Sequence, residues 1–256
     1  MRDMNATRTI PLVERWIICI PGYLQRRGSS RAAIPALHRE LAFAHAGPTC
    51  WVEMFPWHSD WRDVAEWIVQ SSAPRPRIDV FAYSWGVGFG FLRLAKYLRR
   101  HDIEIQNAVL CDGVAHVGPG FAGLHTLSKL LAFLPAWEIV IPDNVRAVYP
   151  LRQEQTRLRG HAMRCADPNA TRLAPFVLDP HRGHTEMDES PSFLGLCKAI
   201  AKYGRPTPAD LRRPVDGPRL ETLGDRAGSG PPGPARPPSE NGTRCDNSPQ
   251  PPNGGT

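Results

Sequence analysis

Short apolar runs alternate with amphipathic stretches along the first 204 residues of the chain. Four runs have the length and composition of buried strands, and two further runs follow them. The stretches between them carry apolar residues three and four positions apart, which predicts helices. The predicted strands are 16–20, 49–55, 78–83, 107–111, 144–149 and 176–178, and the predicted helices are 30–44, 61–69, 91–98 and 191–203. This alternation predicts an α/β fold, with a mostly parallel, doubly wound sheet and helices on both faces.

Proline content changes sharply near Gly204. Of the 27 prolines, 12 fall within the last 52 residues, where aromatic residues are absent. Such a composition buries too little apolar surface to offset an ordering cost of about 1–2 kcal/mol per residue. We therefore expect an α/β domain over residues 1–204 and a disordered Pro/Gly-rich tail over residues 205–256. The alternative for this tail is that the segment 231–238 acts as a polyproline ligand for a protein partner.

The formal net charge of +6 comes from basic residues scattered singly or in pairs between acidic ones. No basic block, zinc-finger spacing or RNA-binding motif accompanies them, so no nucleic-acid partner is expected. The six cysteines form no C-x-x-C pair, and the apolar run 16–20 is too short for a signal peptide. The longer stretch 130–141 is interrupted by Pro135 and Glu138. We therefore expect a cytoplasmic protein without a transmembrane segment.

Candidate chemistry begins where the predicted strand 78–83 ends. Residues 82–86 read Ala-Tyr-Ser-Trp-Gly, and a predicted helix follows. In sheets of this kind ligands bind at the carboxyl ends of the strands, which is where Ser84 stands. A serine before a glycine-rich helix start also serves as a simple N-cap, so the five residues alone leave both interpretations open.

These five residues resemble the nucleophile elbow of α/β-hydrolases, which usually reads G-x-S-x-G. Ala82 replaces the first glycine, at a position that requires a small side chain. The resemblance extends over residues 14–204. It implies a serine hydrolase of the esterase, lipase or thioesterase type, which cleaves a small-molecule carboxylic ester without a cofactor and uses Ser84 as the nucleophile. It also implies an oxyanion hole made by the backbone N–H groups of Tyr23 and Trp85.

The same resemblance implies a catalytic histidine between the last predicted strand and the closing helix. His184 lies there, in a Gly-His segment followed by acidic residues, and is the predicted base. His181 is the nearby alternative, although the adjacent Arg182 would oppose the formation of its imidazolium. The segment also contains several carboxylates and imidazoles, but it lacks the H-E-x-x-H spacing, so no metal is expected.

Two residues compete for the role of the acid. Asp112 follows the predicted strand 107–111 and keeps the family order of serine, acid and histidine. It also begins an Asp-Gly pair, which is common in turns for conformational reasons alone. Glu154 follows the strand 144–149, the commoner place for the acid in this family. The sequence leaves both open, with Asp112 as the preferred candidate.

Other functions fit the same residues. A non-catalytic scaffold that serves as a binding or adaptor module would leave Ser84 and His184 beyond hydrogen-bond reach. Acyl transfer to an alcohol instead of water would use the same groups as hydrolysis. The leucine-rich segment 118–137 either lines an acyl pocket or packs as one more amphipathic helix, which the pattern favours. Four aromatic residues are predicted to fill the core: Trp51, Phe55, Trp57 and Trp61.

Overall fold

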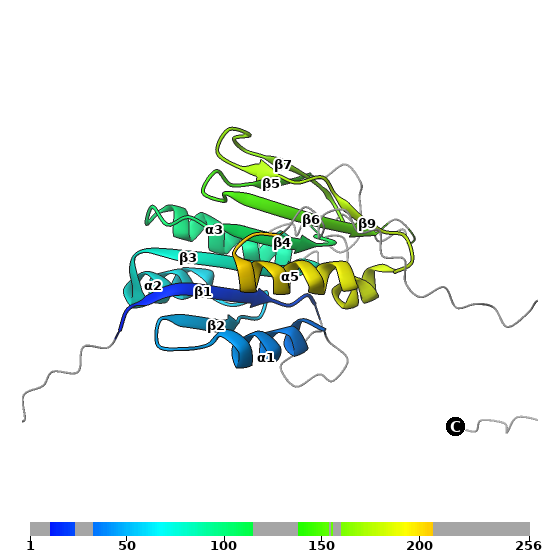
Figure 1. Ribbon diagram of the computed structural model, residues 1–256. Coiled ribbons are helices and arrows are strands. Elements are labelled where there is room, and N and C mark those ends of the chain that lie inside the picture. The colour runs from blue at the N-terminus through cyan, green and yellow to red at the C-terminus, as the bar shows by residue number, and fades with distance from the viewer. Residues whose placement is uncertain (1–10, 24–32, 115–137, 154, 156–159, 207–256) are drawn as a thin grey trace, which may run out of the picture. The chain divides into compact units, whose positions relative to one another are not determined.

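The computed structural model describes residues 11–23, 33–114, 138–153, 155 and 160–206. The predicted fold class is confirmed, because the described strand pairs are all parallel and helices cover both faces of the sheet (Figure 1). All described residues belong to one unit of the chain, Met1–Gly217. Except for its first two residues, the predicted tail 205–256 lies outside the described residues, as do Glu154 and the segment 118–137. The predicted boundary at Gly204 therefore stays a prediction.

Seven strands form the main sheet, in the order β2-β1-β3-β4-β6, with β8 and β9 both paired to β6. Their bounds are β1 (Val13–Ile20), β2 (Cys50–Met54), β3 (Ser72–Tyr83), β4 (Asn107–Cys111), β6 (Ala147–Gln153), β8 (Arg172–Leu173) and β9 (Val177–Asp179). A second, two-stranded sheet consists of β5 (Glu138–Ile141) and β7 (Ala162–Cys165). The described helices are α1 (Ala33–His45), α2 (Trp61–Ser71), η1 (Gly86–Phe91), α3 (Leu92–Arg99), η3 (His184–Glu189) and α5 (Pro191–Tyr203).

The strand β3 begins six residues before the predicted strand 78–83. The prolines at 74 and 76 argue against a strand in that segment, because proline cannot donate to a ladder. In the structure this segment is an irregularity, since the register of β3 against β1 shifts between its first residue and Arg77. Three other short strands, β5, β7 and β8, were not predicted, because two to four residues carry little periodicity.

Alternate residues of the strands face two separate apolar cores. On β3, Val80 and Ala82 pack with the apolar side chains of α2 and α3, whereas Phe81 and Tyr83 pack with those of α1 and α5. Side chains of a strand point alternately to its two faces, so each strand contributes to both cores. The helices α1 and α5 therefore cover one face of the sheet, and α2 and α3 cover the other (Figure 1).

The order of the strands reverses between β1 and β3. These two strands are neighbours, yet the chain leaves β1 through α1 toward β2 and leaves β3 through α3 toward β4. The two connections run over opposite faces, so the chain diverges beyond the carboxyl ends of both strands. Such a switch point forms the crevice in which doubly wound sheets bind ligands. Tyr23 follows β1 and Ser84 follows β3, at this edge.

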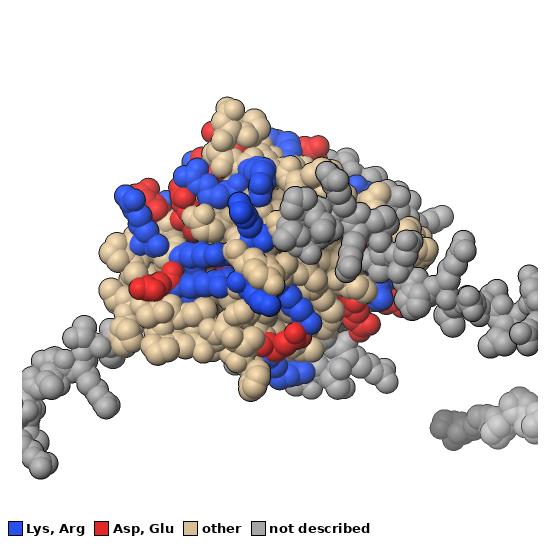
Figure 2. Space-filling view, viewed as in Figure 1, with Lys and Arg blue, Asp and Glu red and all other residues tan. Residues whose placement is uncertain are grey.

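A buried ion cluster connects β1 and β3 with the first residue of β4. Asp79 is fully buried and accepts hydrogen bonds from Arg15 at 2.8 Å, from Arg77 at 3.1 Å and from the amide of Asn107 at 2.7 Å. Both guanidiniums also donate to the carbonyl oxygen of Ile200 near the end of α5. These hydrogen bonds to Ile200 fasten α5 to the sheet. On the face shown in Figure 2, viewed as in Figure 1, Lys and Arg side chains gather near the middle.

Candidate active site

Ser84 occupies the turn from β3 into the π-helix η1 with a left-handed backbone, at φ 54°. Its N–H donates to the carbonyl oxygen of Cys111 at 3.0 Å. Its own carbonyl oxygen accepts from the N–H groups of Val87, Gly88 and Val114, at 3.0, 3.3 and 3.2 Å. A non-glycine residue in this conformation costs about 1–3 kcal/mol and persists only where its surroundings hold it. The four hydrogen bonds supply that constraint.

Two glycines bring the end of β1 against this turn. A Cβ atom at Gly86 would lie 2.3 Å from the carbonyl oxygen of Ile20, and one at Gly22 would lie 3.0 Å from the Cβ atom of Ser84. Neither position has room for a larger residue without a shift of the backbone, so glycine permits the close approach. The segment that carries Tyr23 is therefore held beside Ser84.

The structure brings together the three residues predicted to perform catalysis. Ser84 Oγ lies 2.9 Å from His184 Nε2, and His184 Nδ1 lies 2.5 Å from Asp112 Oδ2. Ser84 is 4% exposed, His184 9% and Asp112 0%. The three side chains come from the β3–η1 turn, the start of η3 and the end of β4, at one edge of the sheet. A carboxylate on Nδ1 favours the tautomer in which Nε2 accepts the serine proton.

The second oxygen of Asp112 is satisfied by the backbone. Its Oδ1 accepts from the N–H of Gly160 at 2.8 Å and from that of Gln153 at 3.4 Å. The backbone of Asp112 is left-handed, at φ 45°, and its N–H donates to the carbonyl oxygen of Leu151 at 2.8 Å. These hydrogen bonds fix the orientation of the carboxylate that faces His184. Sequence reasoning missed the donor at Gly160, since every residue except proline carries a backbone N–H.

Tyr83 holds His184 from the other side, a contact that the sequence did not indicate. Its hydroxyl donates a hydrogen bond to the backbone carbonyl oxygen of His184. The two rings stack with centroids 5.5 Å apart and an angle of 28° between their planes. Burial raises the pKa of Tyr83 above its ordinary value, and the negative charge of Asp188 raises it further. The phenol therefore keeps the proton that it donates.

The η3 turn that carries His184 is fastened at two further points. The Cys111 thiol donates to the carbonyl oxygen of Met187 at 3.3 Å, and burial raises the pKa of that thiol. The carboxylate of Asp188 accepts from the N–H of Ala33, the first residue of α1, at 3.0 Å. These contacts join the turn to β4 and to α1, so the position of the imidazole follows from the packing of the fold.

The alternatives to these residues lie elsewhere. His181 is exposed and donates through its backbone N–H to Asp179, while His184 takes the contact with Ser84. The carboxylate of Asp179 also accepts from the Ser190 hydroxyl at 2.8 Å. In the described ranges of the chain, His, Cys, Asp and Glu side chains do not gather into a group of three or more suited to a metal ion.

The residues predicted to form the oxyanion hole lie next to each other. The rings of Tyr23 and Trp85 are 4.7 Å apart, with an angle of 43° between their planes. Trp85 follows Ser84 directly and has helical backbone angles at the start of η1. Backbone N–H groups at a helix start favour a nearby negative charge. The role of these two N–H groups as oxyanion donors stays a prediction.

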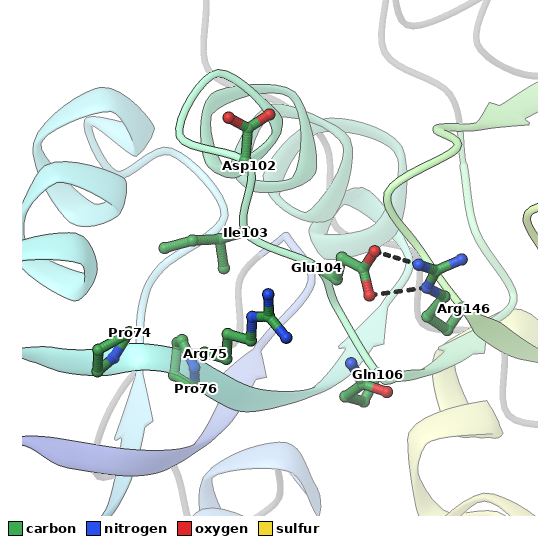
Figure 3. A pocket seen from close by; sticks show the side chains of 8 residues that line it. All are labelled: Pro74, Arg75, Pro76, Asp102, Ile103, Glu104, Gln106 and Arg146. Atoms are coloured by element: carbon green, nitrogen blue, oxygen red, sulfur yellow. Dashed lines mark hydrogen bonds and ion pairs between the residues drawn. The ribbon is translucent and has the colours of Figure 1, made fainter.

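A cavity of about 400 Å³ lies at the other end of the strands (Figure 3). Its lining is Pro74, Arg75, Pro76, Asp102, Ile103, Glu104, Gln106 and Arg146. In its wall Arg146 donates to Glu104 through Nε at 2.7 Å, and both side chains are partly exposed to solvent. These residues precede β4 and β6 or begin β3, so the cavity is separate from the edge that carries Ser84.

Comparisons with known proteins give structural similarity at low sequence identity. No protein-family model matches the chain, and no curated protein matches it. The structure of RedJ thioesterase from the prodiginine biosynthetic pathway in Streptomyces coelicolor is 12% identical, with a TM-score of 0.39, over 74% of this chain and 85% of that chain. RedJ with a PEG molecule bound in its active site is 11% identical, with a TM-score of 0.37, over 74% and 93%. At this level of similarity, function must be inferred from the geometry of the site.

None of the described helices combines the length and the apolar content that a membrane span requires.

Proposed function

We propose that this chain is a serine hydrolase of the α/β-hydrolase type that cleaves a carboxylic ester or thioester. The observation that carries the proposal is the continuous line of contacts from Ser84 Oγ through both nitrogens of His184 to Asp112 Oδ2, at 2.9 and 2.5 Å. Its position supports the same function, because the serine stands on a constrained turn at the switch point of a parallel sheet.

In the first half of the reaction, Ser84 Oγ attacks the substrate carbonyl carbon while His184 Nε2 takes the hydroxyl proton. Asp112 stabilises the imidazolium that forms and keeps Nδ1 as the protonated nitrogen. The backbone N–H groups of Tyr23 and Trp85 donate to the oxyanion. The imidazolium then returns its proton to the leaving alcohol or thiol, and the acyl group remains bonded to Ser84.

In the second half, water attacks the acyl-enzyme and gives its proton to His184 Nε2. The tetrahedral intermediate collapses, the carboxylic acid leaves, and Ser84 Oγ recovers its proton from the imidazolium. These steps use the side chains of Ser84, His184 and Asp112 together with backbone donors. The proposed reaction therefore needs no cofactor. An added alcohol that replaces water in this half would give acyl transfer.

The short distance between Ser84 and His184 argues against a purely non-catalytic scaffold. A scaffold gains nothing from a positive φ at Ser84, or from a buried carboxylate held by backbone N–H groups behind an imidazole. Strain and buried polar groups of this kind are costly and persist where a function uses them.

The test is turnover of p-nitrophenyl esters of graded acyl length and of matching thioesters. We expect hydrolysis by the wild type and its loss in Ser84→Ala. Ser72→Ala is the matched control, because Ser72 lies at the opposite end of β3 and its hydroxyl accepts from Trp16 Nε1 at 2.8 Å. Turnover per folded molecule should persist in that control. Undiminished turnover in Ser84→Ala would refute the proposal, and its absence from the wild type would favour a binding module.

A further inference from the structure

A connected series of aromatic rings begins beside Ser84. The Tyr23 ring lies 4.7 Å from that of Trp85, Trp85 lies 4.9 Å from Trp57, and Trp57 lies 5.5 Å from Phe89. We call Tyr23, Trp57, Trp85 and Phe89 the site aromatic wall. Two of its members are adjacent to the proposed reaction centre. Trp85 follows Ser84 in the chain, and Tyr23 follows Gly22, which packs against Ser84.

A second aromatic group in the same chain shows what a core-filling cluster looks like here. The rings of Trp16, Trp51 and Trp67 lie 5.0–5.3 Å from one another, and Trp16 is 0% exposed. Trp51 and Trp67 are partly buried, as are Trp57, Trp85 and Phe89 of the site aromatic wall. The wall differs in its place beside Ser84 and in Tyr23, which is 46% exposed. An exposed aromatic ring beside a reaction centre can contact a ligand, and the rings that pack behind it can extend that contact.

The structure confirms that the four aromatic residues predicted for the core pack in or against it, and it adds a second set of contacts for one of them. Trp57 was predicted to belong to the core with Trp51, Phe55 and Trp61. Trp61 is buried, and Trp51 and Phe55 pack against the core. Trp57 packs against the same core but also makes ring contacts with Tyr23 and Trp85. It therefore joins the core to the site aromatic wall.

Polar groups lie against two rings of the wall. The guanidinium of Arg93 lies 3.9 Å from the centroid of Phe89, and the His58 ring lies 5.1 Å from that of Trp57. A long aliphatic chain that continued past these rings would desolvate a cation without compensation. An aromatic ring of a substrate is shorter than such a chain, and its face and edges can contact the rings of the wall.

We propose that the site aromatic wall binds an aromatic ring of the substrate. This proposal rests on the hydrolase function proposed above. The preferred substrates are then esters or thioesters that carry an aryl group close to the scissile carbonyl. Ring-to-ring contacts of the offset or edge type favour an aryl group over an aliphatic group of equal size by about 2- to 12-fold.

The first test compares phenylpropionyl, cyclohexylpropionyl and nonanoyl esters of one alcohol, which have equal numbers of acyl carbons. Benzyl and cyclohexylmethyl acetates repeat the comparison on the alcohol side. We expect kcat/KM for the aryl member of at least one series to exceed that of its aliphatic partners by about 3- to 10-fold. In Trp57→Leu this ratio should fall to about one. In the control Trp67→Leu, which removes a tryptophan from the core cluster, the ratio should persist.

The second test measures binding without turnover. Dissociation constants of the same esters are measured by calorimetry on Ser84→Ala and on Ser84→Ala combined with Trp57→Leu. The aryl preference should appear in the first protein and vanish in the second. Equal affinities for aryl and cyclohexyl partners, or a preference that survives loss of Trp57, would overturn the inference. A preserved binding preference without turnover by the wild type would instead overturn the hydrolase proposal alone.

Discussion

Asp79 and Asp112 are both fully buried, and their partners differ in kind. Asp79 on β3 lies level with Asn107, the first residue of β4, whereas Asp112 directly follows the last residue of β4. Asp79 binds the guanidiniums of Arg15 and Arg77, which are permanent cations. Asp112 binds the imidazole of His184, a group that can accept and release a proton. The first carboxylate is compensated by charges that do not change, whereas the second faces a group whose charge can change.

We propose that this difference separates a structural carboxylate, Asp79, from a catalytic one, Asp112. Arg15 and Arg77 bind both Asp79 and the carbonyl oxygen of Ile200 in α5, so this cluster connects only elements of the fold. His184 leads from Asp112 to the Ser84 hydroxyl at the switch point of the sheet. Asp79 and Asp112 are equally buried, and both carboxylates accept hydrogen bonds. They differ in whether the partner side chain can accept and release a proton near neutral pH.

The largest effect is expected from Asp112→Asn. The amide still accepts from the Gly160 N–H, but it no longer stabilises the imidazolium of His184 and favours the wrong tautomer. We expect kcat to fall by about 10³- to 10⁴-fold. Steady-state kinetics, normalised to the folded fraction from circular dichroism, measure the change. A loss of less than about tenfold would remove Asp112 from the mechanism.

Asp79→Asn should lower the free energy of unfolding and leave kcat unchanged. Removal of one member of a buried pair costs about 3–5 kcal/mol when the remaining charges are fully buried. The side chains of Arg15 and Arg77 are 21% and 34% exposed, so we expect a smaller loss, of about 2–3 kcal/mol, in the free energy of unfolding. Urea titration measures it, and kcat per folded molecule should stay unchanged. A loss of kcat as large as that of Asp112→Asn would erase the distinction between the two aspartates.

A smaller effect is expected from Tyr83→Phe, which removes the hydroxyl that holds the His184 carbonyl and keeps the stacked ring. We expect kcat per titrated site to fall by about 3- to 10-fold with KM unchanged, the equivalent of one ordinary hydrogen bond. Tyr149→Phe is the matched control, because it removes another buried hydroxyl, one bound to Arg172. If both variants lose stability and neither loses kcat, Tyr83 has a structural role alone.

The smallest effect at neutral pH concerns Cys19, a third buried acid. Burial raises the pKa of its thiol from 9.0 to about 12. Below pH 9 the thiol is protonated in both states, whereas between the two values only the unfolded chain loses the proton. The free energy of unfolding therefore falls by about 1.4 kcal/mol per pH unit in that window. Urea titrations across that window should show this slope in the wild type minus Cys19→Ala difference, and a flat difference would contradict it.

Much of the fold could be predicted from the sequence because its signals are local. The apolar runs located β4 and α5 with their observed bounds, and the strand–turn–helix pattern around Ser84 located the turn. The choice of Asp112 as the acid used the chain order of an expected family, and the structure brings that residue to His184. The competing Glu154 lies outside the described residues.

What could not be predicted depends on contacts between distant positions. Asp79 is 64 positions from Arg15, and Tyr83 is 101 positions from the carbonyl that it binds. No periodicity carries information about such pairs. The donors to Asp112 are backbone N–H groups, which have no signature in the side-chain sequence. The ring contacts of Trp57 were hidden for a similar reason, since an aromatic residue near other aromatics resembles core.

The most direct test of the comparison between the two aspartates is the rate at which a fluorophosphonate labels Ser84, followed by intact mass and peptide mapping. We predict one adduct, on Ser84, in the wild type and none on this position in Ser84→Ala. Asp79→Asn should react at the wild-type rate per folded molecule, and Asp112→Asn should react at least about 100-fold more slowly. An adduct on another residue, an unreactive wild type, or equal rates in the two aspartate variants would contradict the account.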